Sequence, residues 1–96
     1  SYAELDADFA IDGMPLLETG TTYRNACRLG AQLTITSWVD EWAGKTFVVK
    51  HRVDYADGTL ALEGFERRIM VVKDPDSVRG IKAIEVPEGL RARFDD

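Results

Sequence analysis

Residues 33–55 read LTITSWVDEWAGKTFVVKHRVDY, and this stretch decides the fold. Its second half alternates with a period of two, which is typical of a strand that packs on one face and is solvated on the other. One predicted face carries Phe47, Val49, His51, Val53 and Tyr55, and the other carries Thr46, Val48, Lys50, Arg52 and Asp54. The short sequence Ala43-Gly44-Lys45 predicts a tight connection. We therefore expect residues 33–42 and 46–55 to form an antiparallel hairpin.

The first strand of this hairpin carries two tryptophans. Alternation from Leu33 to Trp42 places Leu33, Ile35, Ser37 and Val39 on one face and Trp38 and Trp42 on the other. Large aromatic side chains on an outer sheet face are costly to leave in water. We expect these tryptophans, or Val48 beside them, to lie at a subunit interface. The alternative is that they pack under a loop.

The flanking sequence predicts further antiparallel strands. Residues 16–25 are rich in threonine, Asp57-Gly58 predicts a second hairpin, and residues 60–73 return as a long strand in which Gly64 can form a bulge. Residues 81–86 can form a short final strand. The prediction is a meander of about four long strands.

Two short helices are predicted at the ends, over residues 1–12 and from Pro87 to about Phe94. A sheet of this area buries one face only if something covers it. Helices of about two turns cover too little. We expect the cover to come from another subunit or from polypeptide outside these 96 residues.

Composition excludes several classes of protein. The 96 residues include 12 Lys and Arg against 17 Asp and Glu, a net charge of −5, which argues against a general nucleic-acid binder. No apolar run approaches the roughly 20 residues of a membrane span, and no signal peptide is visible at the N-terminus. The single cysteine, Cys27, and the single histidine, His51, give no disulfide and no zinc site. A reducing cytoplasm is the simplest location.

The positive charge is concentrated in residues 45–82, which are locally basic within an acidic chain. The bases there are Lys45, Lys50, Arg52, Arg67, Arg68, Lys73, Arg79 and Lys82. One interpretation is a solvated strand surface. The other is a patch that binds a small polyanion such as a nucleotide or a phosphorylated cofactor.

No residue of the sequence has a clear catalytic pattern. Carboxylates on predicted strands, namely Glu18, Glu41, Glu63 and Glu66, are expected to be solvated. We expect His51 to be a packed, hydrogen-bonded residue, and Cys27 to be an incidental thiol without a histidine partner.

Three stretches together resemble the 4-hydroxybenzoyl-CoA thioesterase family of the hotdog fold, and most closely its Pseudomonas-type branch. They are Gly13-Met14-Pro15-Leu16-Leu17-Glu18, the hairpin with Glu41-Trp42-Ala43-Gly44-Lys45 followed by His51 and Val53, and Lys82-Ala83-Ile84-Glu85-Val86-Pro87. The order and spacing of the three make the resemblance fairly specific, and it covers nearly the whole chain.

The resemblance implies an α+β hotdog fold, in which a curved antiparallel sheet wraps a central helix. That helix and the first strand precede the matched region in the family, so residues 1–96 resemble the C-terminal two-thirds of a subunit, a single and N-terminally incomplete domain. The catalytic carboxylate of the family lies in the preceding part. The resemblance therefore names no catalytic residue in this chain.

The function implied is that of a cytoplasmic acyl-CoA thioesterase, a homodimer or homotetramer, that needs no metal or other cofactor. It would hydrolyse acyl-CoA to the free acid and coenzyme A, and the Pseudomonas-type likeness extends this to aryl-CoA such as 4-hydroxybenzoyl-CoA. The alternatives are a non-catalytic hotdog module that binds acyl-CoA or serves in assembly, and an unrelated small β-rich binding domain.

By the same resemblance, Lys45, Arg79 and Lys82 are the expected contacts to the phosphates of coenzyme A. Lysine and arginine suit such groups because they donate charge-assisted hydrogen bonds. The chain departs from the branch at Ala43 and Gly44, where the Pseudomonas-type enzyme carries arginines. The alternative for all three cations is a solvated loop charge.

Overall fold

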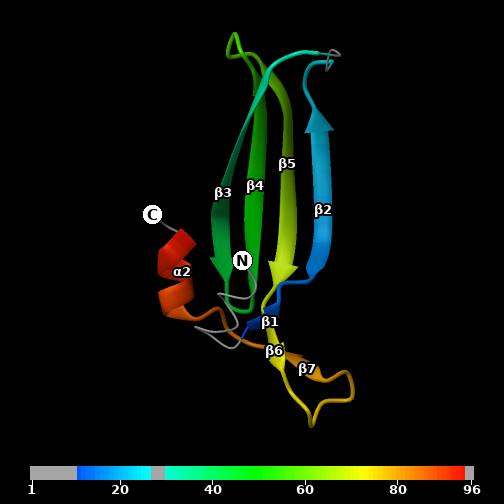
Figure 1. Ribbon diagram of the computed structural model, residues 1–96, viewed down its shortest axis with the longest axis vertical. Coiled ribbons are helices and arrows are strands. Elements are labelled where there is room, and N and C mark those ends of the chain that lie inside the picture. The colour runs from blue at the N-terminus through cyan, green and yellow to red at the C-terminus, as the bar shows by residue number, and fades with distance from the viewer. Residues whose placement is uncertain (1–10, 27–29, 95–96) are drawn as a thin grey trace.

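The computed structural model describes residues 11–26 and 30–94, which form two antiparallel sheets and one short helix. The larger sheet has the order β2-β5-β4-β3, from Leu16–Tyr23, Leu60–Ile69, Thr46–Tyr55 and Leu33–Ala43. The smaller has the order β1-β6-β7, from Ile11–Gly13, Val71–Lys73 and Ile81–Ala83. Helix α2 spans Glu88–Phe94. The long strands stand side by side in Figure 1, with the small sheet at one end of the elongated molecule, which measures 51 × 28 × 23 Å.

The hairpin of β3 and β4 forms where the sequence predicts it. Gly44 lies in the turn with a φ of 64°, a left-handed conformation that costs glycine little. The two strands pair from Ala43 opposite Thr46 to Leu33 opposite Tyr55, with a bulge between Val39 and Glu41. That bulge adds one residue to β3 and changes which side chains share a face.

The bulge separates the two tryptophans, so their predicted common face is wrong. Trp38 lies opposite Lys50, whereas Trp42 lies opposite Phe47 on the other face, with ring centroids 5.5 Å apart. Trp42 packs against the core, and the guanidinium of Arg91 in α2 lies 5.7 Å from its ring. Trp38 remains 42 % exposed.

The predicted strand over residues 60–73 is in fact two strands. The chain leaves the large sheet after Ile69, and Met70 forms its backbone hydrogen bonds with segments outside β5 and β6. The Met70 amide donates to the carbonyl of Lys45 at 2.9 Å, and its carbonyl accepts from the amide of Ile84 at 3.0 Å. With its side chain fully buried, Met70 is the point at which the chain passes from one sheet to the other.

The ends of the chain differ partly from the predictions. Residues 11–13, assigned in part to a helix by the sequence, form β1 and pair with β6, and the rest of that predicted helix lies outside the described residues. Strand β7 ends at Ala83, three residues before the predicted Val86. Helix α2 is confirmed, and Arg91 donates its amide to the carbonyl of Pro87 at 3.0 Å. No helix of the described part is both long and apolar enough to span a bilayer.

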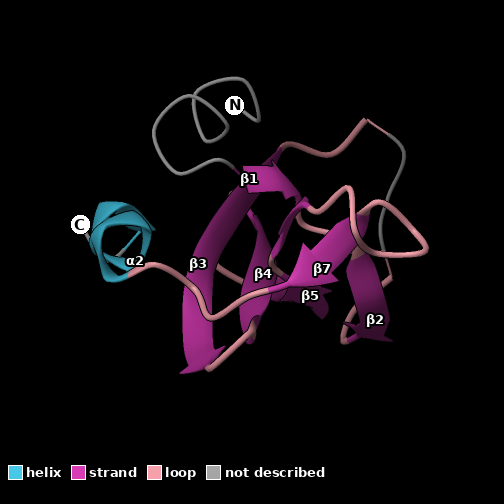
Figure 2. Ribbon diagram, turned by 90° about the horizontal axis from the view of Figure 1, so that it is seen from below, coloured by secondary structure: helices cyan, strands magenta, loops and turns pink. Residues whose placement is uncertain are grey.

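The core lies at the end of the large sheet that carries the β3–β4 turn. Ile11, Phe47, Met70 and Leu90 are buried there, one each from β1, β4, the sheet-to-sheet junction and α2. Figure 2 shows α2 beside β3, with β1 over the sheet. We call the sheet face of Phe47 the core-side face and the face of Trp38 the outer face. Far from α2, the core-side face is open: Leu33, Ile35 and Tyr23 are 45 %, 69 % and 72 % exposed. The short elements therefore cover only one end, as predicted.

Candidate functional site

The three cations predicted to contact coenzyme A lie at the same end of the molecule. Lys45 follows the β3–β4 turn, Lys82 lies in β7, and Arg79 lies in the connection between β6 and β7. These segments gather below the large sheet in Figure 1. The carbonyl of Lys45 accepts a hydrogen bond from the amide of Met70, which directly precedes β6. Lys82 in β7 pairs with Val72 in β6. The fold thus brings together parts of the chain that are about 35 residues apart in sequence.

The absence of an ion pair distinguishes these cations from the bases of the large sheet. All three side chains are exposed, and none of them forms an ion pair within residues 11–26 and 30–94. In contrast, the bases on the large sheet are paired with acids, for example Lys50 with Asp40 at 3.2 Å and Arg52 with Asp54 at 2.9 Å. An unpaired cation keeps its donors for an external anion.

The carboxylate of Glu85 stands close to the β3–β4 turn. A Cβ placed on Gly44 would lie 3.2 Å from Oε2 of Glu85, so the carboxylate of Glu85 lies against the β3–β4 turn. The amide of Val86 donates to the carbonyl of Gly44 at 2.9 Å and holds the two segments in this position. A carboxylate here weakens the local positive potential.

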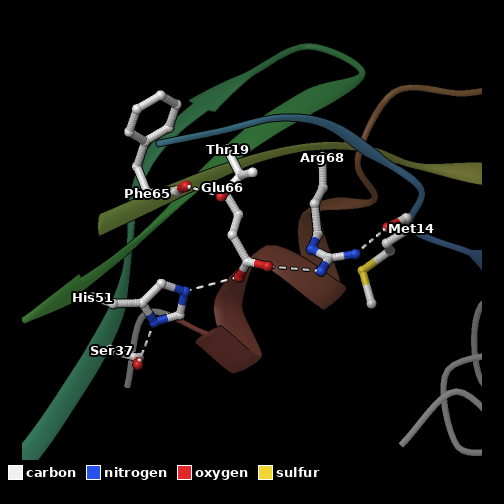
Figure 3. A network of polar contacts seen from close by, with 7 residues as sticks. All are labelled: Met14, Thr19, Ser37, His51, Phe65, Glu66 and Arg68. Atoms are coloured by element: carbon white, nitrogen blue, oxygen red, sulfur yellow. Dashed lines mark hydrogen bonds and ion pairs between the residues drawn. The ribbon is translucent and has the colours of Figure 1, made fainter. Parts of the chain in front are cut away.

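A second group of polar side chains crosses the core-side face (Figure 3). Ser37 Oγ lies 2.7 Å from Nδ1 of His51, and Nε2 of His51 lies 2.8 Å from Oε2 of Glu66. Arg68 donates to Oε1 of Glu66 at 2.8 Å and to the carbonyl of Met14 at 2.8 Å. We call Ser37, His51, Glu66 and Arg68 the polar row.

Contacts within the polar row favour the ionised form of Glu66. The hydrogen bond from His51 and then that from Arg68 hold the pKa of Glu66 below its ordinary value of 4.5, although partial burial acts in the opposite direction. Since an ionised carboxylate only accepts hydrogen bonds, Nε2 of His51 donates to it, and Nδ1 shares a hydrogen bond with the hydroxyl of Ser37. Both ring nitrogens are thus engaged. The expectation that His51 is a packed, hydrogen-bonded residue is confirmed.

The other candidate acids have ordinary surroundings. Glu18 lies 3.5 Å from Arg67, and Glu63 lies 3.2 Å from Arg24, both as exposed ion pairs. Glu41 is exposed, and Cys27 lies outside the described residues. No three metal-ligating side chains gather within the described ranges 11–26 and 30–94.

Sequence reasoning missed the partners of His51. A regular hairpin closed by Ala43 and Thr46 would place Ser37 opposite Arg52, but the bulge moves it opposite His51. Glu66 and Arg68 lie two residues apart on β5, so the period of a strand would have predicted that they share a face. Their register against β4, with Glu66 opposite Val49, is the one that a two-residue turn at Asp57-Gly58 would set.

Comparison with solved structures identifies the architecture as the hotdog fold. The chain is similar to a 4-hydroxybenzoyl-CoA thioesterase mutant complexed with 4-hydroxybenzoyl-CoA, with a TM-score of 0.77 and 24 % identity over 98 % of this chain and 68 % of that one. It is also similar to 4-hydroxybenzoyl-CoA thioesterase from Pseudomonas sp. strain CBS-3, with a TM-score of 0.76 and 24 % identity over 96 % of this chain and 67 % of that one.

A more distant likeness points to the same fold. The probable thioesterase YbaW from Escherichia coli has a TM-score of 0.75 and 18 % identity over 99 % of this chain and 68 % of its own. No family model and no curated protein matches the sequence. The chain spans about two-thirds of the length of these structures. The hotdog fold expected from the sequence is confirmed, with a curved sheet in place and no long central helix among residues 11–26 and 30–94.

Proposed function

We propose that this chain is a hotdog domain of an acyl-CoA thioesterase, which hydrolyses acyl-CoA to the free acid and coenzyme A. The observation that carries the proposal is the likeness of 98 % of the chain to a thioesterase complexed with its CoA substrate. Two further similar structures point the same way: a gentisyl-coenzyme A thioesterase, and a thioesterase from Thermus thermophilus complexed with coenzyme A and zinc. The similarity to the 4-hydroxybenzoyl-CoA thioesterase supports aryl groups such as 4-hydroxybenzoyl among the acyl groups that are hydrolysed.

In this proposal Lys45, Arg79 and Lys82 hold the phosphates of coenzyme A. The support is their common position at one end of the fold, their exposure and their lack of an ion pair with any described acid. Three flexible cations can neutralise a diphosphate and a ribose phosphate while the acyl part extends elsewhere.

Thioester hydrolysis also needs a carboxylate that attacks or activates water, and dipoles that stabilise the oxyanion. The proposal gives this role to no described residue. Glu18, Glu63 and Glu66 are engaged by arginines, and Glu66 by His51 as well. The described residues would supply the sheet and the coenzyme A contacts. Neither a metal nor another cofactor is part of the proposed reaction.

The remaining parts of the proposal concern assembly and location. We place residues 1–96 in one domain, active as a homodimer or homotetramer in the cytoplasm, with acyl-CoA and not nucleic acid or membrane as its partner. The net charge of −5 supports the exclusion of nucleic acid.

The test is hydrolysis of a panel of aryl- and alkyl-CoA esters, measured through the release of the free thiol. Replacing Lys45 and Lys82 together by Ala should raise KM for acyl-CoA by roughly ten- to a hundredfold, since two charge-assisted contacts are lost. The KM for a truncated pantetheine thioester, which lacks the phosphates, should stay nearly unchanged. Lys50→Ala is the matched control, because Lys50 is already paired with Asp40.

The second candidate function is a non-catalytic module that binds acyl-CoA. It is favoured by the absence of an available carboxylate in the polar row, where Glu66 is held by His51 and Arg68. Calorimetric binding of acyl-CoA without any thiol release would select this function. Equal KM changes for acyl-CoA and the pantetheine thioester in the double variant would instead contradict the phosphate assignment.

A further inference from the structure

Three members of the polar row have the arrangement of a nucleophile, a base and an orienting acid (Figure 3). Ser37 Oγ lies 2.7 Å from Nδ1 of His51, and Oε2 of Glu66 lies 2.8 Å from Nε2 of the same ring. The three residues come from β3, β4 and β5, respectively. A hydroxyl within hydrogen-bond reach of an imidazole that a third group orients is the signature of an activated nucleophile.

The contacts of Glu66 set the roles of the two ring nitrogens. Hydrogen bonds from His51 and Arg68 favour the ionised form of Glu66, so its Oε2 accepts from the Nε2–H of His51. A neutral imidazole carries one N–H and one lone pair, and the lone pair is then on Nδ1, which faces the hydroxyl of Ser37. The nitrogens have exchanged the places that they take in the triad of serine proteases, but either nitrogen can accept a proton.

Ser37 is accessible to a reactant. It is exposed, whereas the side chains of His51 and Glu66 are only 32 % and 27 % exposed. On the other side of the histidine ring, Gly64 lies opposite His51 and has no side chain to cover it, and the surface is hollowed between Gly64, Thr21 and the ring. A shielded base beside an open hydroxyl suits attack on a molecule that arrives from solvent.

The backbone of β3 offers a donor for the oxyanion of such an attack. This strand is at the edge of the large sheet, so one of its sides has no partner strand within residues 11–26 and 30–94. Successive amides of an antiparallel strand point alternately toward the partner and away from it, and the pairing with β4 is regular around Ser37. Either the amide of Ser37 or that of Trp38 therefore points away from β4, where it can donate to a developing oxyanion.

An apolar strip beside Ser37 fits the acyl part of a substrate. Ile35 and Leu33 precede Ser37 by two and four residues on the same face and are 69 % and 45 % exposed. Val53 lies opposite Ile35, and Leu62 lies opposite Val53. The strip is about 13 Å long at ~3.3 Å per residue, so it can hold a chain of several carbons. Because burial of each methylene group is favourable, longer acyl groups should be preferred to acetyl.

We propose that Ser37, His51 and Glu66 form an acyl-transfer site for uncharged esters of apolar carboxylic acids. Ser37 Oγ attacks the ester carbonyl carbon while its proton passes to Nδ1 of His51, and Glu66 stabilises the imidazolium. The bond from this carbon to the ester oxygen breaks, and the leaving alkoxide takes the proton from Nδ1. Water then attacks acyl-Ser37 by the same proton path, which releases the acid and restores the hydroxyl.

This site is a further activity that does not depend on the proposed hydrolysis of acyl-CoA. It uses neither Lys45 nor Lys82, and an oxygen ester without phosphates is its substrate. Replacing both lysines by Ala should therefore leave the reaction at Ser37 unchanged.

The test uses two reagents on the full chain. Hydrolysis of p-nitrophenyl hexanoate and p-nitrophenyl acetate is measured through the release of p-nitrophenol, and the hexanoate should react faster. An alkyl fluorophosphonate labels an activated serine without turnover, and mass spectrometry of the digested protein should place the label on Ser37. Ser37→Ala should lose the label and the hydrolysis, and His51→Gln should slow both about a hundredfold, as expected for loss of a general base.

Thr36→Ala is the matched control. Thr36 precedes Ser37 on β3 but lies opposite Arg52, away from the histidine, so both rates should stay unchanged. Circular dichroism verifies that each variant is folded. A wild type without label on Ser37 overturns the inference and needs no variant. An equal rate of labelling in His51→Gln, or an equal loss in Thr36→Ala, also contradicts it.

Hydrolysis of acyl-CoA by the wild type is measured separately. Hydrolysis of acyl-CoA without labelling of Ser37 contradicts only the acyl-transfer site, and labelling without hydrolysis of acyl-CoA contradicts only the thioesterase proposal.

Discussion

The polar row leads to a quantitative prediction about stability. Glu66 accepts one hydrogen bond from His51 and one from Arg68, both at 2.8 Å, and its side chain is 27 % exposed. A charge-assisted hydrogen bond contributes about 1.5–3 kcal/mol when it is well shielded and much less at the surface. Because Glu66 is partly exposed, its replacement in Glu66→Gln should lower the free energy of unfolding by about 1–2 kcal/mol. The amide keeps the shape of the side chain, removes its charge and replaces one of the two acceptor oxygens by an NH2 donor.

The same residue predicts a pH dependence. Its pKa in the folded protein is below 4.5, so the folded state binds the proton of Glu66 more weakly than the unfolded state does. The stabilisation is complete above the pKa of the unfolded chain and is lost as the pH falls through the lower pKa of the folded protein. Below about pH 4.5 the wild type should therefore lose more stability than Glu66→Gln does. The free energies of unfolding of the two proteins should then converge.

Urea unfolding followed by tryptophan fluorescence measures both effects, at about pH 7 and in steps below about pH 5. Glu63→Gln is the matched control, because Glu63 pairs with Arg24 on the same sheet but both side chains are about half exposed. Its expected cost is at most ~0.5 kcal/mol. The reasoning is refuted if the two variants lose equal free energy of unfolding at neutral pH. It is also refuted if the free energy of unfolding of Glu66→Gln falls with decreasing pH as much as that of the wild type.

Two further predictions concern packing. Leu90→Ala should cost about 2–4 kcal/mol in urea unfolding, because Leu90 is fully buried and joins α2 to the core, and a cost below ~1 kcal/mol would contradict that role. Gly20→Ala should cost about 1–2 kcal/mol by the same assay, because a Cβ there would lie 2.5 Å from the ring of Phe65 and the ring must move. Gly13→Ala is its control, since no atom lies within 4 Å of the added carbon, and equal costs for the two would show that the ring contact is not responsible.

The candidate site could be predicted only in part from the sequence. A family resemblance supplied Lys45, Arg79 and Lys82, and the fold places them at one end without testing what they bind. The polar row was not predicted beyond a hydrogen-bonded His51. Its assembly depends on the register of β3, β4 and β5, and the bulge in β3 shifts the register of Ser37 by one residue from the one that the hairpin turn alone would set.

What the sequence by itself determined is the local structure of the sheet. Alternation of side chains over residues 46–55 and the Ala43-Gly44-Lys45 turn specified β4 and its hairpin, because a period of two and a glycine at positive φ act over a few residues. Tertiary structure alone decided which face Trp42 occupies and where β5 ends. Both depend on distant partners: the bulge in β3 lets Trp42 pack against Phe47 and the core, and Met70 leaves β5 to bond with Lys45 and Ile84. The burial of these side chains favours an irregular backbone that the alternating pattern does not predict.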